Sequence, residues 1–246
     1  MRAIKLVIVL NIVFCITTSL KASDEIPLQN YCPPGFELTD ARLCEFRSLY
    51  QLYPSLANKG VGGLRIGLPE ARDGFSPEQI DLGRYLFFDP VLSIDGSMSC
   101  ASCHDPDKGF SDGRARGIGV AGRELARSAP SLWNSGFLSK YFWDGRAHSL
   151  EEQMQGPLYA DNEMGNSPEN LLKTLNSITA YRRLFRVAFD TERITLEHIY
   201  TAIAAFEGSL ISLNSRYDRY AHGYHAALSD KEIEGLNVFR SFVARC

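Results

Sequence analysis

The pentapeptide Cys100-Ala101-Ser102-Cys103-His104 decides how the rest of this 246-residue chain is interpreted. Two thiols three positions apart on one helical turn form thioether bonds to the two vinyl groups of a porphyrin. The adjacent imidazole then lies beneath the iron as its ligand. The pentapeptide therefore predicts a covalently attached haem c, held by Cys100, Cys103 and His104, with His104 as the metal ligand.

Two other kinds of site use a Cys-x-x-Cys pair, and neither suits the chain as well. A redox-active dithiol belongs to a setting of alternating strands and helices, and no segment here alternates convincingly between apolar and polar side chains. A zinc site needs a second close pair of ligands. His222 and His225 form the only other such pair, and they bring no cysteine. Haem is the better interpretation.

Helical signals surround the pentapeptide. Ser76-Pro77-Glu78-Gln79 combines an N-cap, a proline at the first helical position and a capping box, which predicts a helix to about Phe88. Ser149-Leu150-Glu151-Glu152 is a second capping box, and Ser167-Pro168-Glu169 opens another helix. Apolar residues spaced i, i+3, i+4 predict three more helices: Tyr181 to Phe189, Ile199 to Leu210, and one capped at Ser229 that carries Ile233, Leu236 and Val243.

These signals predict an all-α fold, a cytochrome c-like haem domain with long irregular loops. The longest loop runs from about Asp105 to His148 and is rich in Gly, Ser and Arg. So long a loop in a compact domain is usually functional, and here it is expected to wrap a large prosthetic group.

The N-terminus differs in character from the rest. Arg2 and Lys5 precede an apolar stretch from Leu6 to Leu20, a layout typical of a secretory signal. Residues 1–22 are therefore predicted to be a signal peptide that exports the protein to the periplasm, with an uncleaved anchor as the alternative. Residues 23–75 form an N-terminal extension rich in Pro and Gly.

Export also bears on Cys32 and Cys44, because disulfides persist in oxidising compartments. These cysteines are expected either to pair, stapling the extension, or to be two unrelated thiols. The formal net charge of −3 and the absence of a Lys/Arg cluster argue against nucleic acid as a partner.

Several short motifs, in this order, resemble the bacterial di-haem cytochrome c peroxidases and the related MauG-type enzymes. The resemblance covers residues 76–246. It rests on Leu82-Gly-Arg-Tyr-Leu-Phe-Phe-Asp89, the Cys100–His104 pentapeptide, Ala129-Pro-Ser-Leu-Trp-Asn134, Phe142-Trp-Asp-Gly-Arg146, Glu151-Glu-Gln153, Gly156-Pro157 and Glu163-Met-Gly165.

The resemblance implies a role for each matching residue. His104 matches the proximal ligand of the peroxidatic haem, and Glu163 matches the distal acid–base catalyst, which takes a proton from peroxide and returns it to the departing oxygen. Gln153 and Pro157 match further distal-pocket residues. Trp143 matches the tryptophan that lies between the two haems.

Each of these residues has a plainer interpretation when taken alone. Glu163 stands in a polar segment and would ordinarily be a solvated surface carboxylate. Trp143 would ordinarily be a core aromatic, and Gln153 an exposed helix residue. Arg146 suits either a haem propionate or a local ion pair. The remaining histidines have no motif and are interpreted as surface or capping residues: His148, His198, His222 and His225.

Two positions depart from the family pattern. Many relatives carry a loop histidine that occupies the sixth coordination position of this haem, and by its spacing to Trp143 that position is Val120 here. A valine does not ligate iron, so the distal site is expected to be open, and a six-coordinate low-spin ferric spectrum would contradict this. Ser128 stands where the family usually has an asparagine that helps to bind calcium, which puts calcium in doubt.

The C-terminal residues 226–246 resemble the start of the family's second haem domain. Cys246 would then be the first cysteine of a second haem-attachment motif, with a second haem c expected in a full-length protein, or it is an unrelated terminal cysteine. Residues 76–225 form the N-terminal, peroxidatic haem domain.

The resemblance implies a periplasmic peroxidase that reduces hydrogen peroxide with electrons from a small donor protein, such as a cytochrome c or a cupredoxin, and that forms a homodimer in some members. Two other functions stay open. One is a MauG-type enzyme that oxidises a partner protein. The other is an electron-transfer cytochrome without catalysis, which would need a sixth ligand such as Met154 or Met164.

Overall fold

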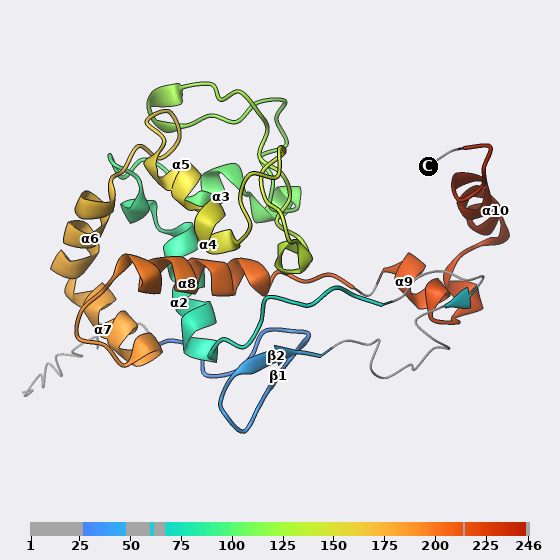
Figure 1. The fold of residues 1–246 in the computed structure, drawn as a ribbon, viewed down its shortest axis with the longest axis horizontal. Coiled ribbons are helices and arrows are strands. Elements are labelled where there is room, and N and C mark those ends of the chain that lie inside the picture. Colours follow the sequence, from blue (N-terminus) through green and yellow to red (C-terminus); the bar gives the residue numbers. More distant parts are fainter. Residues whose placement is uncertain (1–26, 48–59, 62–66, 214, 245–246) are drawn as a thin grey trace, which may run out of the picture.

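Helix α2 (Pro77–Phe88) and helix α8 (Leu196–Gly208) pack against each other at the centre of the molecule (Figure 1). The computed structural model describes residues 27–47, 60–61, 67–213 and 215–244. The close approach of the two helices depends on Gly83, because a Cβ atom there would lie 1.8 Å from the carbonyl oxygen of Ala202. The predicted signal peptide, residues 1–22, and Cys246 lie outside the described residues.

The start of α2 is fixed by the predicted capping box. The hydroxyl of Ser76 accepts a hydrogen bond from the Gln79 backbone N–H at 3.1 Å, and the Gln79 side chain accepts one from the Ser76 N–H at 3.0 Å. The helix ends at Phe88, as predicted, and Asp89 follows in an extended conformation.

Helices α3 (Cys100–Cys103) to α7 (Thr179–Phe189) lie around this central pair (Figure 1). The prediction of an all-α fold is confirmed, and α6 and α7 supply the expected apolar faces through Leu171, Leu175, Leu184 and Phe185. The remaining helices are α3 (Cys100–Cys103), α4 (Leu150–Gln153), α5 (Gln155–Tyr159), α6 (Pro168–Ser177), α7 (Thr179–Phe189), α9 (Arg216–Ala221) and α10 (Asp230–Phe239).

Two helices end earlier than the apolar pattern predicts. Leu210 lies beyond the end of α8 but is still buried. The helix that begins at Ser229 is α10, and it ends at Phe239, so Val243 lies outside it and is exposed. Apolar side chains mark burial as well as helical periodicity, which is why the pattern overran the helix at Leu210.

The N-terminal extension contains a small antiparallel sheet that the sequence did not indicate. Strand β1 (Phe36–Leu38) pairs with β2 (Cys44–Phe46), and Cys32 forms a disulfide bond with Cys44. The Cys44 N–H donates to the Phe75 carbonyl at 2.7 Å, which attaches the sheet to the residues before α2. Of the two expectations for these cysteines, pairing is the one observed.

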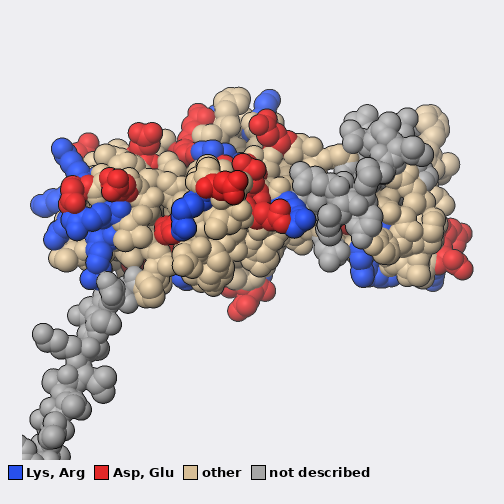
Figure 2. Space-filling model, turned by 90° about the horizontal axis from the view of Figure 1, so that it is seen from below, with Lys and Arg blue, Asp and Glu red and all other residues tan. Residues whose placement is uncertain are grey.

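Helices α9 and α10 stand apart from the central pair (Figure 1). None of the helices that the structure describes combines the length and the apolar character of a membrane span. On the face seen in Figure 2, basic side chains gather at the end formed by α6 and α7, whereas acidic and basic side chains mix elsewhere.

Candidate active site

A cavity of about 560 Å³ opens between α3, α4, α5 and the long loop 105–148. This volume falls within the range of roughly 300–1,000 Å³ that cofactor sites usually occupy. Every described residue of the predicted site lines the cavity: Cys100, Cys103, His104, Trp143, Gln153, Pro157 and Glu163. Among the described lining residues, His104 is the one histidine, so His148, His198, His222 and His225 stand elsewhere.

The two motif cysteines are unpaired and lie on the single turn of α3, with Cys100 and Cys103 both facing the cavity. Burial raises the pKa of both thiols, and the nearby carboxylates of Glu207 and Asp112 add to the shift at Cys100 and Cys103 respectively. The two sulfur atoms are therefore held as neutral thiols at the wall of an apolar cavity.

A hydrogen bond to the Phe110 backbone fixes the orientation of the His104 ring. Its Nδ1 atom lies 2.9 Å from the Phe110 carbonyl oxygen, an acceptor, so Nδ1 carries the proton and Nε2 is left as the nitrogen with a free lone pair. Phe110 itself has a left-handed backbone (φ +57°). Its N–H donates to the Asp105 carbonyl at 2.8 Å, which holds this strained turn in place. Burial lowers the pKa of His104, and hydrogen bonds to the backbone of Phe110 and Pro130 oppose that shift.

These residues fit a haem c. Two free thiols and a neutral imidazole with Nε2 available face one cavity of suitable volume, and the long loop encloses it as expected. Buried Met98, Met154 and Met164 line the same cavity, so its wall is largely apolar.

Glu163 lines the same cavity as the motif and lies on the turn that follows α5. Its N–H donates to the Ala160 carbonyl at 2.9 Å, and its own carbonyl accepts from the Val120 N–H at 2.8 Å. The carboxyl is half-buried. Burial raises its pKa, and the positive charge of Arg146 partly offsets the shift.

The loop that carries Val120 packs directly on the Glu163 segment. A Cβ atom at Gly119 would lie 1.9 Å from the Asn162 carbonyl oxygen, so only glycine allows this approach. Val120 is 6% exposed and belongs to the apolar core. Gly119 lines the cavity, whereas the Val120 side chain is directed into the core. The expectation of an open sixth position stays a prediction.

Gln153 and Pro157 come from the short helices α4 and α5. The Ser149 hydroxyl accepts from the Glu152 N–H at 3.0 Å, which caps α4 as predicted, but the Glu152 side chain accepts from His148 instead of Ser149. One turn later, Gly156 makes room for the ring of Phe142, because a Cβ atom there would approach the ring to 2.8 Å.

Trp143 lies at the rim of the cavity and is 64% exposed. Its indole N–H donates to the Ser128 carbonyl at 3.0 Å, so Ser128 contributes its backbone here. The next residue, Asp144, accepts from Arg127 at 2.9 Å and from Arg146 at 2.8 Å. These two cations hold the pKa of Asp144 at about 2, and the three side chains join the two halves of the loop.

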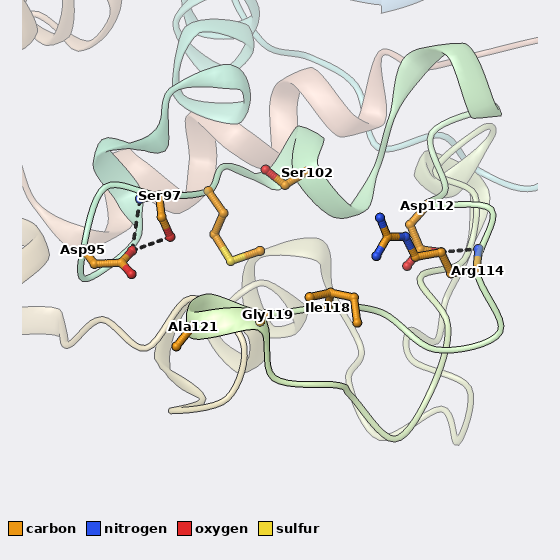
Figure 3. A pocket seen from close by; sticks show the side chains of 10 residues that line it. Asp95, Ser97, Ser102, Asp112, Arg114, Ile118, Gly119 and Ala121 are labelled. Atoms are coloured by element: carbon orange, nitrogen blue, oxygen red, sulfur yellow. Dashed lines mark hydrogen bonds between the residues drawn. The ribbon is translucent and has the colours of Figure 1, made fainter.

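A second, more open pocket of about 500 Å³ adjoins the first and shares Met98 and Gly119 with it. Figure 3 shows Asp95 and Ser97 on one side of this pocket and Asp112 and Arg114 on the other. Asp112 is 5% exposed, and its Oδ1 accepts from the Arg114 N–H at 3.0 Å.

One cavity residue was missed by the sequence analysis. Glu207, on α8, lines the cavity one turn after Ile203 and is 5% exposed. The signal that would have found it is a lone carboxylate in the apolar run Ala204-Ala205-Phe206-Glu207, since Glu is almost never fully buried without a reason.

Comparisons with known proteins agree with this geometry. The statistical model of the family described as "Di-haem cytochrome c peroxidase" matches residues 77–226. The chain is 36% identical over 184 residues to the cytochrome c551 peroxidase of Nitrosomonas europaea, covering 75% of this chain and 54% of the relative. It is 39% identical over 165 residues to the methylamine utilization protein MauG of Methylorubrum extorquens, covering 67% and 47%.

A solved structure is similar as well. The crystal structure of a MauG-like protein associated with microbial copper homeostasis superimposes with a TM-score of 0.65 at 35% identity, covering 72% of this chain and 53% of that one. The chain thus spans about half the length of each of these three proteins.

Proposed function

The chain belongs to the di-haem cytochrome c peroxidase family, and on that premise we propose that it carries one haem c in this cavity and reduces hydrogen peroxide there. The observation that carries the proposal is the meeting of Cys100, Cys103, His104 and Glu163 around one cavity. Electrons would come from a small donor protein such as a cytochrome c or a cupredoxin.

Cys100 and Cys103 would form the two thioether bonds, and Nε2 of His104 would ligate the iron. When bound, haem c supplies the redox chemistry that cleaves the O–O bond of peroxide. The Phe110 carbonyl holds His104 in the tautomer that leaves Nε2 free. The protein thus contributes a ligand of fixed orientation before any substrate arrives.

Glu163 is proposed to move the proton. Its carboxylate takes a proton from peroxide and gives it to the departing oxygen, so the same group acts first as a base and then as an acid. A half-buried carboxyl whose pKa is raised suits both steps better than a fully solvated one. Gln153 and Pro157, on the same wall, would shape the space in which peroxide lies.

Trp143 is proposed to lie on the electron path. Its ring lines the cavity and is also largely exposed, so a single side chain connects the cavity to the surface. The same exposure favours the second candidate, a MauG-type enzyme that oxidises a partner protein, because such an enzyme also needs an electron path to its surface.

A third candidate is an electron-transfer cytochrome. Met154 and Met164 both line the cavity, and a thioether on the iron would block peroxide. The spectrum of the ferric haem separates the electron-transfer cytochrome from the other two candidates, since a methionine ligand gives a low-spin iron and an open site does not.

We also propose that the protein works in the periplasm. The basic and apolar layout of residues 1–22 supports export, and the Cys32–Cys44 disulfide suits an oxidising compartment. A fusion to alkaline phosphatase at a site after residue 47 would be active only if the segment is exported.

The peroxidase proposal is tested by mixing the haem-loaded chain with hydrogen peroxide and following the Soret band. Glu163→Gln should slow the spectral change by roughly 10²–10⁴-fold, the usual contribution of a general acid–base group. Glu169→Gln, an exposed position on α6, is the matched control and should react like the wild type. Equal rates in wild type and Glu163→Gln would refute the role of Glu163.

A further inference from the structure

The Glu207 carboxyl is the most deeply buried acid of the cavity wall. Its Oε2 atom has no hydrogen-bond partner among the described residues and no contact with solvent, although Glu207 is one of the residues that line the cavity. A charged carboxylate in such a place would carry the full cost of desolvation. With no positive charge in the cavity the neutral acid is favoured, and burial together with the Glu151 carboxylate raises the pKa of Glu207 to about 8. A positive charge bound in the cavity would act in the opposite direction and favour the carboxylate.

The charged groups around Glu207 come from several elements. The negative charge of Glu151 on α4 raises the pKa of Glu207. The charges of both glutamates raise the pKa of Tyr141 in the long loop. Arg72, in the N-terminal extension, forms an ion pair with Glu151. Cys100 of α3 lies close enough for Glu207 to raise the pKa of its thiol.

Helix α2 packs along α8 as well, and its charged residues pair with partners of their own. Arg84 donates from Nε to Asp81 at 2.7 Å, and Glu78 accepts from Arg42 at 3.4 Å. Of the groups that surround Glu207, Glu151 is thus the one that acts directly on its charge.

We propose that Glu207 is a proton-holding group for the haem, taking up one proton when the haem is reduced and releasing it when the haem is oxidised. The balance is simple. One electron from the donor protein enters the iron, one proton from solvent binds the Glu207 carboxylate, and no other bond changes. Oxidation returns both.

The coupling follows from Coulomb's law. Reduction removes one positive charge from the haem, so a negative charge at Glu207 becomes less favourable, and the affinity of its carboxylate for a proton rises. Glu207 lies close enough to Cys100 to act on its thiol, and Cys100 would form one of the two thioether bonds that hold the haem. The low dielectric of the buried wall strengthens the effect.

Glu151 is the partly exposed acid nearest in effect to Glu207. Its side chain is 22% exposed, it pairs with Arg72, and its charge acts on Glu207. Glu151, a second carboxyl group that is partly exposed to solvent, is suited to relay protons to and from Glu207. Glu207 acts on the reaction through the haem, so it is a positioning residue and not a catalytic one.

This inference rests on the haem attachment in the proposed function but not on peroxide chemistry. The test is the midpoint potential of the haem-loaded full chain, measured by spectroelectrochemistry from about pH 5 to about pH 10. The variants are Glu207→Gln, Glu151→Gln, Glu163→Gln and the control Glu197→Gln, an exposed glutamate in the first turn of the same helix.

In the wild type the potential should fall with rising pH over a window near pH 8, where the protonated carboxyl gives way to the carboxylate. A tenfold difference in the acidity of Glu207 between the two oxidation states corresponds to about 59 mV between the plateaus. Glu207→Gln should remove this window and stay near the low-pH plateau. Glu151→Gln should move the window to lower pH, because a negative neighbour is lost, and Glu163→Gln and Glu197→Gln should keep it.

A window that persists in Glu207→Gln would assign it to another group and overturn the proposal. A wild-type midpoint potential that does not change with pH would also overturn the proposal. This measurement does not depend on the folding of any variant. The infrared difference spectrum of the reduced minus the oxidised protein adds a second readout. It should contain a carboxylic-acid C=O band that Glu207→Gln lacks. If these results are not observed but the chain still reacts with peroxide, the proposal for Glu207 is wrong and the proposed function is unaffected.

Discussion

Two glutamates line the same cavity in opposite environments. Glu163 lies on the turn after α5, half-buried, with the cation Arg146 nearby, whereas Glu207 lies on the central helix α8, fully buried, with the anion Glu151 nearby. Burial raises the pKa of both. The second charge then acts in opposite directions, lowering the pKa of Glu163 and raising that of Glu207.

This difference matches the two roles proposed for these glutamates. A carboxyl that must take and return a proton in each turnover should change its charge easily, which the neighbouring cation favours at Glu163. A deeply buried carboxyl, whose protonation responds strongly to a nearby charge, suits a proton store whose state follows the charge of the haem. In the proposals made for this chain, one residue type would serve two roles, set by burial and by a single neighbouring charge.

The largest expected effect comes from a substitution that displaces Glu163 and not Glu207. Gly119→Val would place a side chain against Asn162, where a Cβ atom already lies 1.9 Å from the carbonyl oxygen. The Glu163 segment must then move away, and a displacement of about 1 Å in an acid–base group costs on the order of 100-fold in rate. The rate of the Soret change with peroxide measures this.

The pH window of the potential should stay in Gly119→Val, because the three atoms nearest to a Cβ at Gly119 belong to Asn162 and Glu163 and not to α8. Gly235→Ala is the matched control, since no atom lies within 4 Å of a Cβ at Gly235. A wild-type peroxide rate in Gly119→Val would contradict the placement of Glu163.

The next effect concerns Glu207 and how the free energy of unfolding depends on pH. The pKa of Glu207 in the folded protein, about 8, lies above the value of about 4.3 expected in an unfolded chain. Between these values the folded state binds more protons, so the free energy of unfolding should decline as pH rises through that window, by roughly 2–4 kcal/mol.

Urea unfolding at several pH values checks this prediction. Glu207→Gln should lose the decline, whereas Glu197→Gln on the exposed face of α8 should keep it. The same decline in Glu207→Gln would show that its carboxyl is not the group that titrates.

The smallest effect sharpens the contrast between the two neighbouring charges. Glu163 must be ionised to accept a proton, so the peroxide rate should fall as pH falls through its pKa. Arg146 lowers that pKa, and Arg146→Gln should therefore move the fall to higher pH. Since Arg146 is about half exposed and screened by solvent, the rate on the acid side should drop only about two- to threefold.

Arg116→Gln removes a different exposed arginine, one that pairs with Glu124 at 2.9 Å, and should leave the profile unchanged. A shift to lower pH in Arg146→Gln would reverse the assigned sign.

Much of this site could be predicted from the sequence because its residues are tied to short motifs. The spacing of Cys100, Cys103 and His104 is a chemical requirement of haem attachment, and the caps at Ser76, Ser149 and Ser229 are local. The family resemblance added Glu163, Trp143, Gln153 and Pro157, which the structure places on the same cavity.

The remainder depends on contacts between distant residues. Glu207 lies on an apolar helix face, and only the packing of α8 behind α3 and α4 makes it part of the cavity. The β1–β2 sheet has strands of three residues, too short for an alternating pattern to be visible. The environment of a carboxyl is likewise absent from its sequence neighbourhood, since Arg72 reaches Glu151 from 79 positions away.

Both glutamates line the cavity in which a haem c is proposed to be attached to Cys100 and Cys103. The attachment is tested by the intact mass of the denatured chain after production in a bacterium that attaches haem c. We expect a mass increase of one haem that survives denaturation, and its loss in Cys100→Ala/Cys103→Ala but not in Glu163→Gln. A chain without covalent haem under these conditions, or covalent haem retained in the double cysteine variant, would show that these cysteines do not attach haem.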